Sequence, residues 1–189
     1  MIGVLVSGEG TNLQALLDAK LPVVAVASNN TKAKALDRAA QAGIEAGAFP
    51  TAEFDSRERR DEEQAEWLAE RGVELVVLAG YMQLLTTQFL ERFPGRILNV
   101  HPSLLPAFPG AHAVEDALTH GVKVTGATVH FVDEGIDTGP IVLQEAVEVR
   151  EGDTPETLHA RIQAVEHRLL PAAVRLFLDG KLSSPVEAA

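Results

Sequence analysis

The chain opens with MIGVLVSGEGTNLQALLDA (residues 1–19), and this stretch predicts how the fold begins. Ile2–Ser7 is a short, almost wholly apolar run, which is typical of a strand covered on both faces. Asn12–Ala19 follows with a helical pattern. The segment Ser7-Gly8-Glu9-Gly10-Thr11-Asn12 therefore joins a buried strand to a helix. Its glycines let the backbone approach an anion, and the helix N-terminus supplies free N–H groups and the positive end of the helix dipole. We predict a phosphate site here; the alternative is that the glycines only make a tight turn.

The same segment disfavours a dinucleotide such as NAD. Gly8 and Gly10 match the first two glycines of the Gly-x-Gly-x-x-Gly fingerprint, but Leu13 stands where the third belongs. The second strand-like run ends in Ser28-Asn29-Asn30, without the acid that would hold a ribose hydroxyl. The sequence thus favours one phosphate of a smaller ligand, and Glu9 must point away from it.

Strands and helices alternate through the first 105 residues. Strand-like apolar runs recur at Val23–Ser28, Glu74–Ala79 and Ile97–His101, and helical patterns lie between them at Lys32–Ala42, Ser56–Arg71 and Thr86–Phe93. This order predicts an α/β fold, a Rossmann-like, mostly parallel sheet with helices on both faces.

After residue 105 the rhythm changes. We expect a short helix at Ala111–His120, two strands at Lys123–Asp133 and Pro140–Arg150, and a long helix from Thr154 towards Asp179, with Pro171 as a break or kink. The two strands are joined so briefly that they must pair antiparallel. Residues 183–189 are expected to fray. The whole chain, 1–189, is predicted to be one domain, with a phosphate-binding parallel half (1–105) and a second half that carries the C-terminal helix (106–189).

Composition limits the function. The 189 residues are 46% hydrophobic and 23% charged, as in a globular domain, and Asp plus Glu outnumber Lys plus Arg by 27 to 16, a net charge of −11. Such acidity argues against nucleic-acid and membrane-surface partners, but not against a local basic pocket. With no cysteine there is no disulfide, thiol nucleophile or zinc ribbon. No targeting or membrane-spanning segment is visible. We expect a soluble, cytoplasmic protein with small-molecule ligands, as a monomer or homodimer.

A second motif, Asn99-Val100-His101-Pro102-Ser103-Leu104-Leu105-Pro106, stands at the carboxyl end of a predicted strand, where open α/β sheets bind ligands. Alternation places Asn99 and His101 on one side, about 7 Å apart. A histidine there can act as a general acid or base, or be a hydrogen-bonded turn residue.

A third motif, Asp133-Glu134-Gly135-Ile136-Asp137-Thr138-Gly139-Pro140, puts three acids in a loop between strands. It is either a solvated acidic turn or the source of a carboxylate that faces His101 and fixes its protonation. His130, in the preceding strand, fits either core or site. The remaining histidine pairs are spaced eight apart, which does not fit a metal pair, so we predict no metal.

Together, residues 7–14, residues 99–106 and the loop that ends at Asp137 resemble the phosphoribosylglycinamide formyltransferase family of the folate-dependent formyltransferase superfamily. The likeness runs in order over about residues 2–180. It implies transfer of a formyl group from 10-formyltetrahydrofolate to the amine of 5-phosphoribosylglycinamide in purine biosynthesis. It also implies a single formyltransferase domain, whose second half lies on the folate side.

The resemblance also assigns residues. It implies a catalytic trio of Asn99, His101 and Asp137. It implies that the substrate is bound by Gly10, Thr11 and Asn12, with Leu13 and Gln14 beside them and Glu166 near the ribose. It implies that the folate co-substrate is contacted by Arg57, Met82, Gln83, Leu84, Leu85 and Asn99, and by the loop residues Asp133, Glu134, Gly135, Ile136 and Asp137.

Two departures bear on the folate side. Members of the family often carry basic residues where Gln83 and Ala107 stand, so the positive field around the folate tail is expected to be weaker here. Glu9 replaces a neutral residue beside the phosphate loop.

The alternatives are distinguishable. A formyltetrahydrofolate hydrolase should carry a regulatory domain and a methionyl-tRNA formyltransferase a basic C-terminal domain, and neither expectation fits this acidic sequence of 189 residues. A nucleotide-binding module without catalysis would bind a phosphate ligand and form no product. A dinucleotide oxidoreductase is weakened by Leu13 and Asn29.

Overall fold

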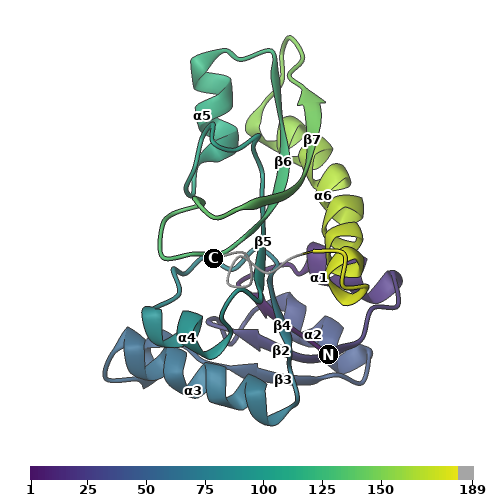
Figure 1. Cartoon of the computed structure of the whole chain (residues 1–189). Helices are drawn as coiled ribbons and strands as arrows, with labels where there is room; N and C mark the ends of the chain where they lie inside the picture. Colours follow the sequence, from purple (N-terminus) through teal and green to yellow (C-terminus); the bar gives the residue numbers. More distant parts are fainter. Residues whose placement is uncertain (183–189) are drawn as a thin grey trace.

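A computed structural model describes residues 1–182 of the chain, which form one seven-stranded sheet flanked by helices (Figure 1). The strands are β1 (Ile2–Val6), β2 (Val23–Ser28), β3 (Glu45–Ala48), β4 (Leu75–Leu78), β5 (Ile97–His101), β6 (Val124–Phe131) and β7 (Ile141–Glu148). Their spatial order is β3-β2-β1-β4-β5-β6-β7. The first five strands pair in parallel, and β6 is antiparallel to both β5 and β7, which confirms the predicted mixed sheet.

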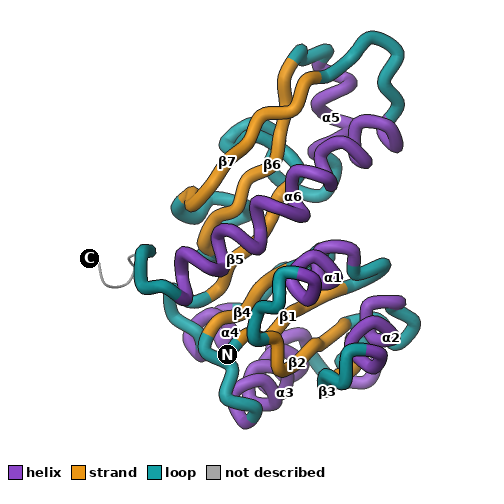
Figure 2. Tube along the Cα trace, turned by 90° about the vertical axis from the view of Figure 1, so that its right-hand side faces the viewer, coloured by secondary structure: helices purple, strands orange, loops and turns teal. Residues whose placement is uncertain are grey.

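Helices cover both faces of the sheet. The helices are α1 (Thr11–Asp18), α2 (Lys34–Gln41), η1 (Thr51–Glu53), α3 (Arg57–Glu70), α4 (Thr87–Arg92), α5 (Ala113–His120) and α6 (Pro155–Leu178). Alternate strand residues bury on opposite faces: Val4 joins a core with side chains of α1, α2 and α6, whereas Leu5 joins one with α3 and α4. In Figure 2, α6 runs beside the long β6–β7 pair and α3 lies at the far end of the molecule. No helix within residues 1–182 has the length and apolarity needed to cross a membrane.

The strand order reverses between β1 and β4, because β2 follows β1 to one side and β5 follows β4 to the other. Ligands bind beyond the carboxyl ends of the strands at such a point. Three loops meet there, those after β1, β4 and β5. The first two are in contact, since Ser7 N donates to Gly80 O (3.1 Å) and Met82 N donates to Ser7 Oγ (2.8 Å).

Most of the predicted elements are confirmed within a few residues. Two elements, β3 and η1, were not predicted. The strand β3 reads EAGA and is largely exposed at the sheet edge, so it has no β-branched or large apolar residue to mark it as a strand. A break or kink was expected at Pro171, and the break was wrong, since α6 is continuous through this residue. The expectation of fraying concerns residues 183–189, which lie outside the described part of the chain.

The turn between β1 and α1 is built around Gly10, which has φ +74° and precedes the helix. A Cβ on Gly10 would lie 2.6 Å from Ala35 Cβ and 2.8 Å from Ala35 Cα. Ala35 N also donates to Gly8 O (3.1 Å). The start of α2 thus packs directly beneath this loop, and only glycine fits the contact.

Gly10→Ala should therefore destabilise the protein by roughly 1–3 kcal/mol, through a positive φ and an overpacked contact. Gly8→Ala is the matched control, because no atom lies within 4 Å of its added Cβ and its φ is not positive. Urea unfolding of both variants measures the difference. Equal stability of the two variants would contradict the close packing of Gly10 on Ala35.

Candidate active site

The Asp137 carboxylate stands at the centre of a polar cluster at the carboxyl end of β5. Its Oδ2 lies 3.3 Å from His101 Nδ1 and accepts from Gly110 N at 2.8 Å. Its Oδ1 lies 3.5 Å from His130 Nε2 and accepts from Asn99 Nδ2 at 3.4 Å. One carboxylate thus contacts two imidazoles, an amide side chain and a backbone N–H. The structure brings together all three residues of the expected trio.

Strand pairing and loop geometry place these side chains. Asn99 and His101 alternate along β5, and the β5–β6 register sets Asn99 directly opposite His130. In the β6–β7 loop, Asp133 Oδ1 accepts from Gly135 N (3.0 Å) and Thr138 Oγ1 (2.7 Å), which folds the loop back. Asp137 itself adopts φ +54°. A non-glycine residue in the left-handed region is uncommon and concentrates at functional sites.

His101 is buried, with only 4% of its surface exposed, and both ring nitrogens face acceptors. Nδ1 faces Asp137 Oδ2, and Nε2 lies 2.8 Å from Phe108 O. A neutral imidazole has one donor, so only the doubly protonated ring satisfies both partners. Phe108 has φ +53°, and this strained residue fixes the carbonyl in place.

Asp137 is ionised in this setting. Burial alone would raise its pKa, but the hydrogen bonds from His130 and from the Gly110 N–H, with the charge of His101, outweigh burial and lower the pKa of this carboxyl. The carboxylate is therefore available as an acceptor throughout the neutral range.

The loop before α1 forms a second polar region, where α6 packs against α1. The buried Glu166 (4% exposed) accepts from Asn12 Nδ2 at 2.9 Å, and Gln163 Nε2 donates to Thr11 Oγ1 at 2.9 Å. Burial raises the pKa of Glu166 despite the opposing hydrogen bond from Asn12. Asn12 Oδ1 is buried and has no partner among residues 1–182. A buried polar atom without a partner points to a ligand group or water that satisfies it.

Glu9 points away from the helix N-terminus, as the sequence analysis required. Its carboxylate pairs with Lys34 Nζ at 2.9 Å, and both side chains are exposed. Arg38 Nε donates to Glu9 O (2.8 Å) and Arg38 Nη1 donates to Gln14 Oε1 (3.1 Å). These contacts leave the N–H groups at the start of α1 without a nearby carboxylate from Glu9.

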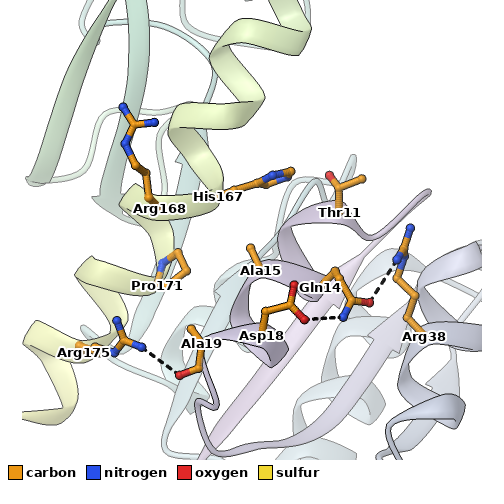
Figure 3. A pocket seen from close by; sticks show the side chains of 10 residues that line it. All are labelled: Thr11, Gln14, Ala15, Asp18, Ala19, Arg38, His167, Arg168, Pro171 and Arg175. Carbon is orange, nitrogen blue, oxygen red and sulfur yellow. Dashed lines mark hydrogen bonds between the residues drawn. The ribbon is translucent and has the colours of Figure 1, made fainter.

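A hollow of about 560 Å³ adjoins this loop on the outer side of α1 (Figure 3). It is lined by Thr11, Gln14, Ala15, Asp18 and Ala19 from α1, by Arg38 from α2 and by His167, Arg168, Pro171 and Arg175 from α6. Of its three arginines only Arg38 lies beside the predicted phosphate loop, where its Nε donates to Glu9 O (2.8 Å). Arg168 pairs with Glu145, and Arg175 Nη2 donates to Ala19 O (2.9 Å) at the other end of α1.

The expected folate wall lies after β4, next to the phosphate loop. The side chains of Met82 and Leu84 are exposed (70% and 55%), and Arg57 Nη2 donates to Leu84 O at 2.9 Å. Ile136, in the loop that carries Asp137, is 52% exposed. Gln83 contributes no charge; its Oε1 accepts from Arg60 Nη1 at 3.2 Å. Exposed apolar side chains of this size commonly mark a binding surface.

The sequence did not predict two contributors, Gln163 and Gly110, and left the role of a third, His130, open. Gln163 lies one helical turn before Glu166, so helical spacing from Glu166 could have found it. The sequence left open whether His130 belongs to the core or to the site. The strand register, which sets His130 opposite Asn99, places it in the Asp137 cluster. Gly110 contributes a backbone N–H, which no side-chain pattern reveals. Within residues 1–182 no group of three His, Asp or Glu side chains is placed to hold a metal ion.

Glu166→Gln should become more stable relative to wild type as the pH rises. The folded protein holds the Glu166 proton more tightly than the unfolded chain, so wild type loses stability as the pH rises from the ordinary value of 4.5 through the raised folded pKa. The uncharged amide of the variant does not titrate, so the variant has no such loss. Thermal unfolding of both proteins between pH 4 and pH 9 measures this difference in stability, because 1 kcal/mol shifts Tm by about 2–4 °C in a protein of this size.

The control variant should show the opposite pH dependence of stability relative to wild type. Hydrogen bonds from its own backbone N–H and from the Thr154 side chain lower the pKa of the exposed Glu156. Glu156→Gln should therefore lose stability relative to wild type as the pH rises through the acidic range. A Glu166→Gln difference in Tm that is independent of pH would show that the buried carboxyl is not perturbed.

Comparison with known proteins adds the family. The model of the family described as "Formyl transferase" matches residues 1–174. Phosphoribosylglycinamide formyltransferase of Mycobacterium tuberculosis is 51% identical, over 90% of this chain and 81% of that protein. The crystal structure of glycinamide ribonucleotide transformylase 1 from Symbiobacterium toebii superposes with a TM-score of 0.94 at 54% identity, covering 96% of this chain and 89% of that one.

A third relative is much longer. The chicken protein named trifunctional purine biosynthetic protein adenosine-3 is 45% identical over 95% of this chain, which spans only 18% of its length. The match to the family model and the full-length bacterial relatives settle the assignment. The chain belongs to the formyl transferase family and, within it, to the phosphoribosylglycinamide formyltransferases.

Proposed function

We propose that this chain transfers the formyl group from N10 of 10-formyltetrahydrofolate to the amine of 5-phosphoribosylglycinamide. The observation that carries the proposal is the Asp137 cluster at the carboxyl end of β5, two strands from the phosphate loop after β1. Neighbouring strands are about 4.8 Å apart, so the two regions are separated by about 10 Å. This span suits one ligand with a phosphate at one end and a reactive amine at the other.

The reaction needs no nucleophile from the protein. The substrate amine attacks the formyl carbon, a C–N bond forms, and the formyl oxygen of the tetrahedral intermediate gains negative charge. The bond between N10 and the formyl carbon then breaks, the amine loses a proton and N10 gains one. The absence of cysteine from the sequence is compatible with this direct route.

Asn99 and His101 supply donors for the developing oxyanion. A single donor of this kind typically contributes about 2.7–4 kcal/mol. In this structure His101 Nε2 is directed at Phe108 O, and Asn99 Nδ2 at Asp137 Oδ1. The formyl oxygen therefore replaces protein acceptors when it arrives, in line with catalytic hydrogen bonds that tighten only in the substrate complex.

Asp137 orients the His101 ring and takes part in proton transfer. Its ionised carboxylate lies beside the His101 Nδ1–H and can accept the amine proton directly or through a water. The proton then returns to N10. General acid–base assistance contributes roughly 10²–10⁴ in rate, and holding the two substrates together supplies much of the remainder.

The binding roles follow the two polar regions. The N–H groups of Gly10, Thr11 and Asn12 hold the phosphate, Leu13 and Gln14 lie beside it, and Glu166 with Asn12 Oδ1 faces the ribose and glycinamide groups. On the folate side, Met82, Leu84 and Ile136 present exposed apolar surface, and Arg57, Gln83, Leu85 and the backbone of residues 133–137 complete the site. Family membership supports a folate-derived formyl donor.

An omission assay tests the function. Purified protein, glycinamide ribonucleotide and 10-formyltetrahydrofolate should give formylglycinamide ribonucleotide and tetrahydrofolate, measured by absorbance. Omitting either substrate should abolish the signal. Release of formate without the ribonucleotide would instead indicate a hydrolase, and no turnover with both substrates would indicate a binding module.

Substitutions should separate chemistry from binding. His101→Ala and Asp137→Ala should lower kcat by roughly 10²–10⁴-fold, because each removes part of the proton and oxyanion machinery. Thr11→Val should chiefly raise KM for the ribonucleotide, because the hydroxyl belongs to the phosphate loop. Steady-state kinetics with each substrate varied in turn measures both. A His101→Ala protein with wild-type kcat would refute the assignment.

A further inference from the structure

The wall, residues 81–86, contains the expected folate-contacting residues Met82, Gln83, Leu84 and Leu85. It is an irregular segment between β4 and α4, and besides the bond from Met82 N to Ser7 Oγ (2.8 Å) its polar contacts are mainly with side chains of α3. The segment forms no strand or helix. Backbone N–H and C=O groups outside helices and strands need other hydrogen-bond partners, such as side chains. Tyr81 OH donates to Gln64 Oε1 at 3.3 Å, and Thr86 N donates to Asp61 Oδ2 at 2.8 Å. The first turns of α3 therefore fix both ends of the wall.

The source of these bonds is a buried ion pair. Arg60 and Asp61 are completely buried, and Arg60 Nη2 lies 2.6 Å from Asp61 Oδ1. Arg60 Nε donates to the same oxygen at 2.9 Å, while Nη1 donates to Thr51 Oγ1 (3.0 Å) and to Gln83 Oε1 (3.2 Å). Every nitrogen of the guanidinium is thus engaged. Such a fully desolvated pair is weak evidence for stability and can be kept for what it positions.

The pattern along α3 supports a positioning role. The buried face of the helix is polar in its first two turns, at Arg60, Asp61 and Gln64, and apolar only afterwards, at Ala65 and Leu68. An apolar face throughout would pack on the core as well. The polar part coincides with the half of the helix that bonds to residues 81–86.

We propose that Arg60 and Asp61 are positioning residues that hold the wall in its binding conformation and so set the affinity for the formyl donor. This inference rests on the proposed function. The pair holds Gln83 and the Thr86 backbone, while Met82 and Leu84 between them stay exposed to meet the ligand. The pair touches no reacting group, so its loss acts on donor binding and leaves the chemical step unchanged.

The main test is the double variant Arg60→Met/Asp61→Leu. It replaces the pair by apolar side chains of similar size, a change that folded proteins commonly tolerate, and it removes the bonds to residues 83 and 86. We expect KM for 10-formyltetrahydrofolate to rise roughly 5- to 50-fold, because ordering the wall now draws on binding free energy. The kcat and the KM for the ribonucleotide should stay within about twofold.

The matched control removes another ion pair. Arg161 Nη2 lies 2.7 Å from Asp153 Oδ1 at the start of α6, which lies at the opposite end of the molecule from α3 (Figure 1). Arg161→Met/Asp153→Leu should leave the donor KM unchanged. An unchanged donor KM in the Arg60/Asp61 variant, or an equal change in both variants, would overturn the proposal, as would a loss confined to kcat.

Asp61→Asn provides a second route if the double variant does not fold. The amide keeps the size of the side chain but offers one acceptor oxygen instead of two, so either Thr86 N or Arg60 loses its partner. The donor KM should rise in the same direction, and amide hydrogen exchange should quicken in residues 81–86 but not in the β1–α1 loop. Unchanged exchange in residues 81–86 with an unchanged donor KM would refute the positioning role.

Two measurements distinguish a failure of this proposal from a failure of the proposed function. Hydrogen exchange of residues 81–86 needs no turnover, and calorimetric titration with tetrahydrofolate measures folate affinity directly. If wild type forms no product, the proposed function fails, whereas the exchange result still decides whether the pair holds the segment. If wild type is active and folate affinity does not change in the variants, only the positioning role fails.

Discussion

The contact of one carboxylate with two imidazoles is the interaction on which the site depends. The Asp137 carboxylate has partners at both oxygens. Oδ2 faces His101 Nδ1 and accepts from Gly110 N, while Oδ1 faces His130 Nε2 and accepts from Asn99 Nδ2. Buried charges are costly unless they are paired and hydrogen-bonded, and here the pairing is sufficient to keep the pKa of the carboxyl lowered despite burial. The strained backbone at Asp137 and Phe108 is maintained by the same contacts.

The sheet brings two other regions next to the Asp137 cluster. Parallel strands β1, β4 and β5 end at one edge, so the predicted phosphate loop, the wall (residues 81–86) and the Asp137 cluster become adjacent although they are dispersed along the sequence. The antiparallel strand β6 then adds His130 and returns the acidic loop towards β5. Helices flank two of these regions: α2 packs under the predicted phosphate loop, α6 supplies Glu166 and Gln163 beside it, and side chains of α3 hydrogen-bond to residues 81–86.

The sequence predicts the parts that follow from local patterns. Continuous apolar runs such as Val23–Ser28 predict buried strands, and the glycines after β1 predict the anion loop. The expected nearness of Asp137 to His101 came from motif order and family resemblance. The edge strand β3 was not predicted and the role of His130 was left open between core and site, because both depend on pairing partners that are distant in sequence. The burial of the Arg60–Asp61 pair was not predicted, since helical periodicity does not distinguish a solvated charge from one that is paired in the interior.

The protonation of His101 in the folded protein tests the central claim most directly. Nitrogen-15 NMR of histidine-labelled protein at neutral pH should show both ring nitrogens of His101 protonated, because both face acceptors. In Asp137→Asn the same ring should revert to a neutral tautomer with the proton on Nε2, facing Phe108 O. A single protonated nitrogen on His101 in the wild-type protein, unchanged by Asp137→Asn, would contradict the account.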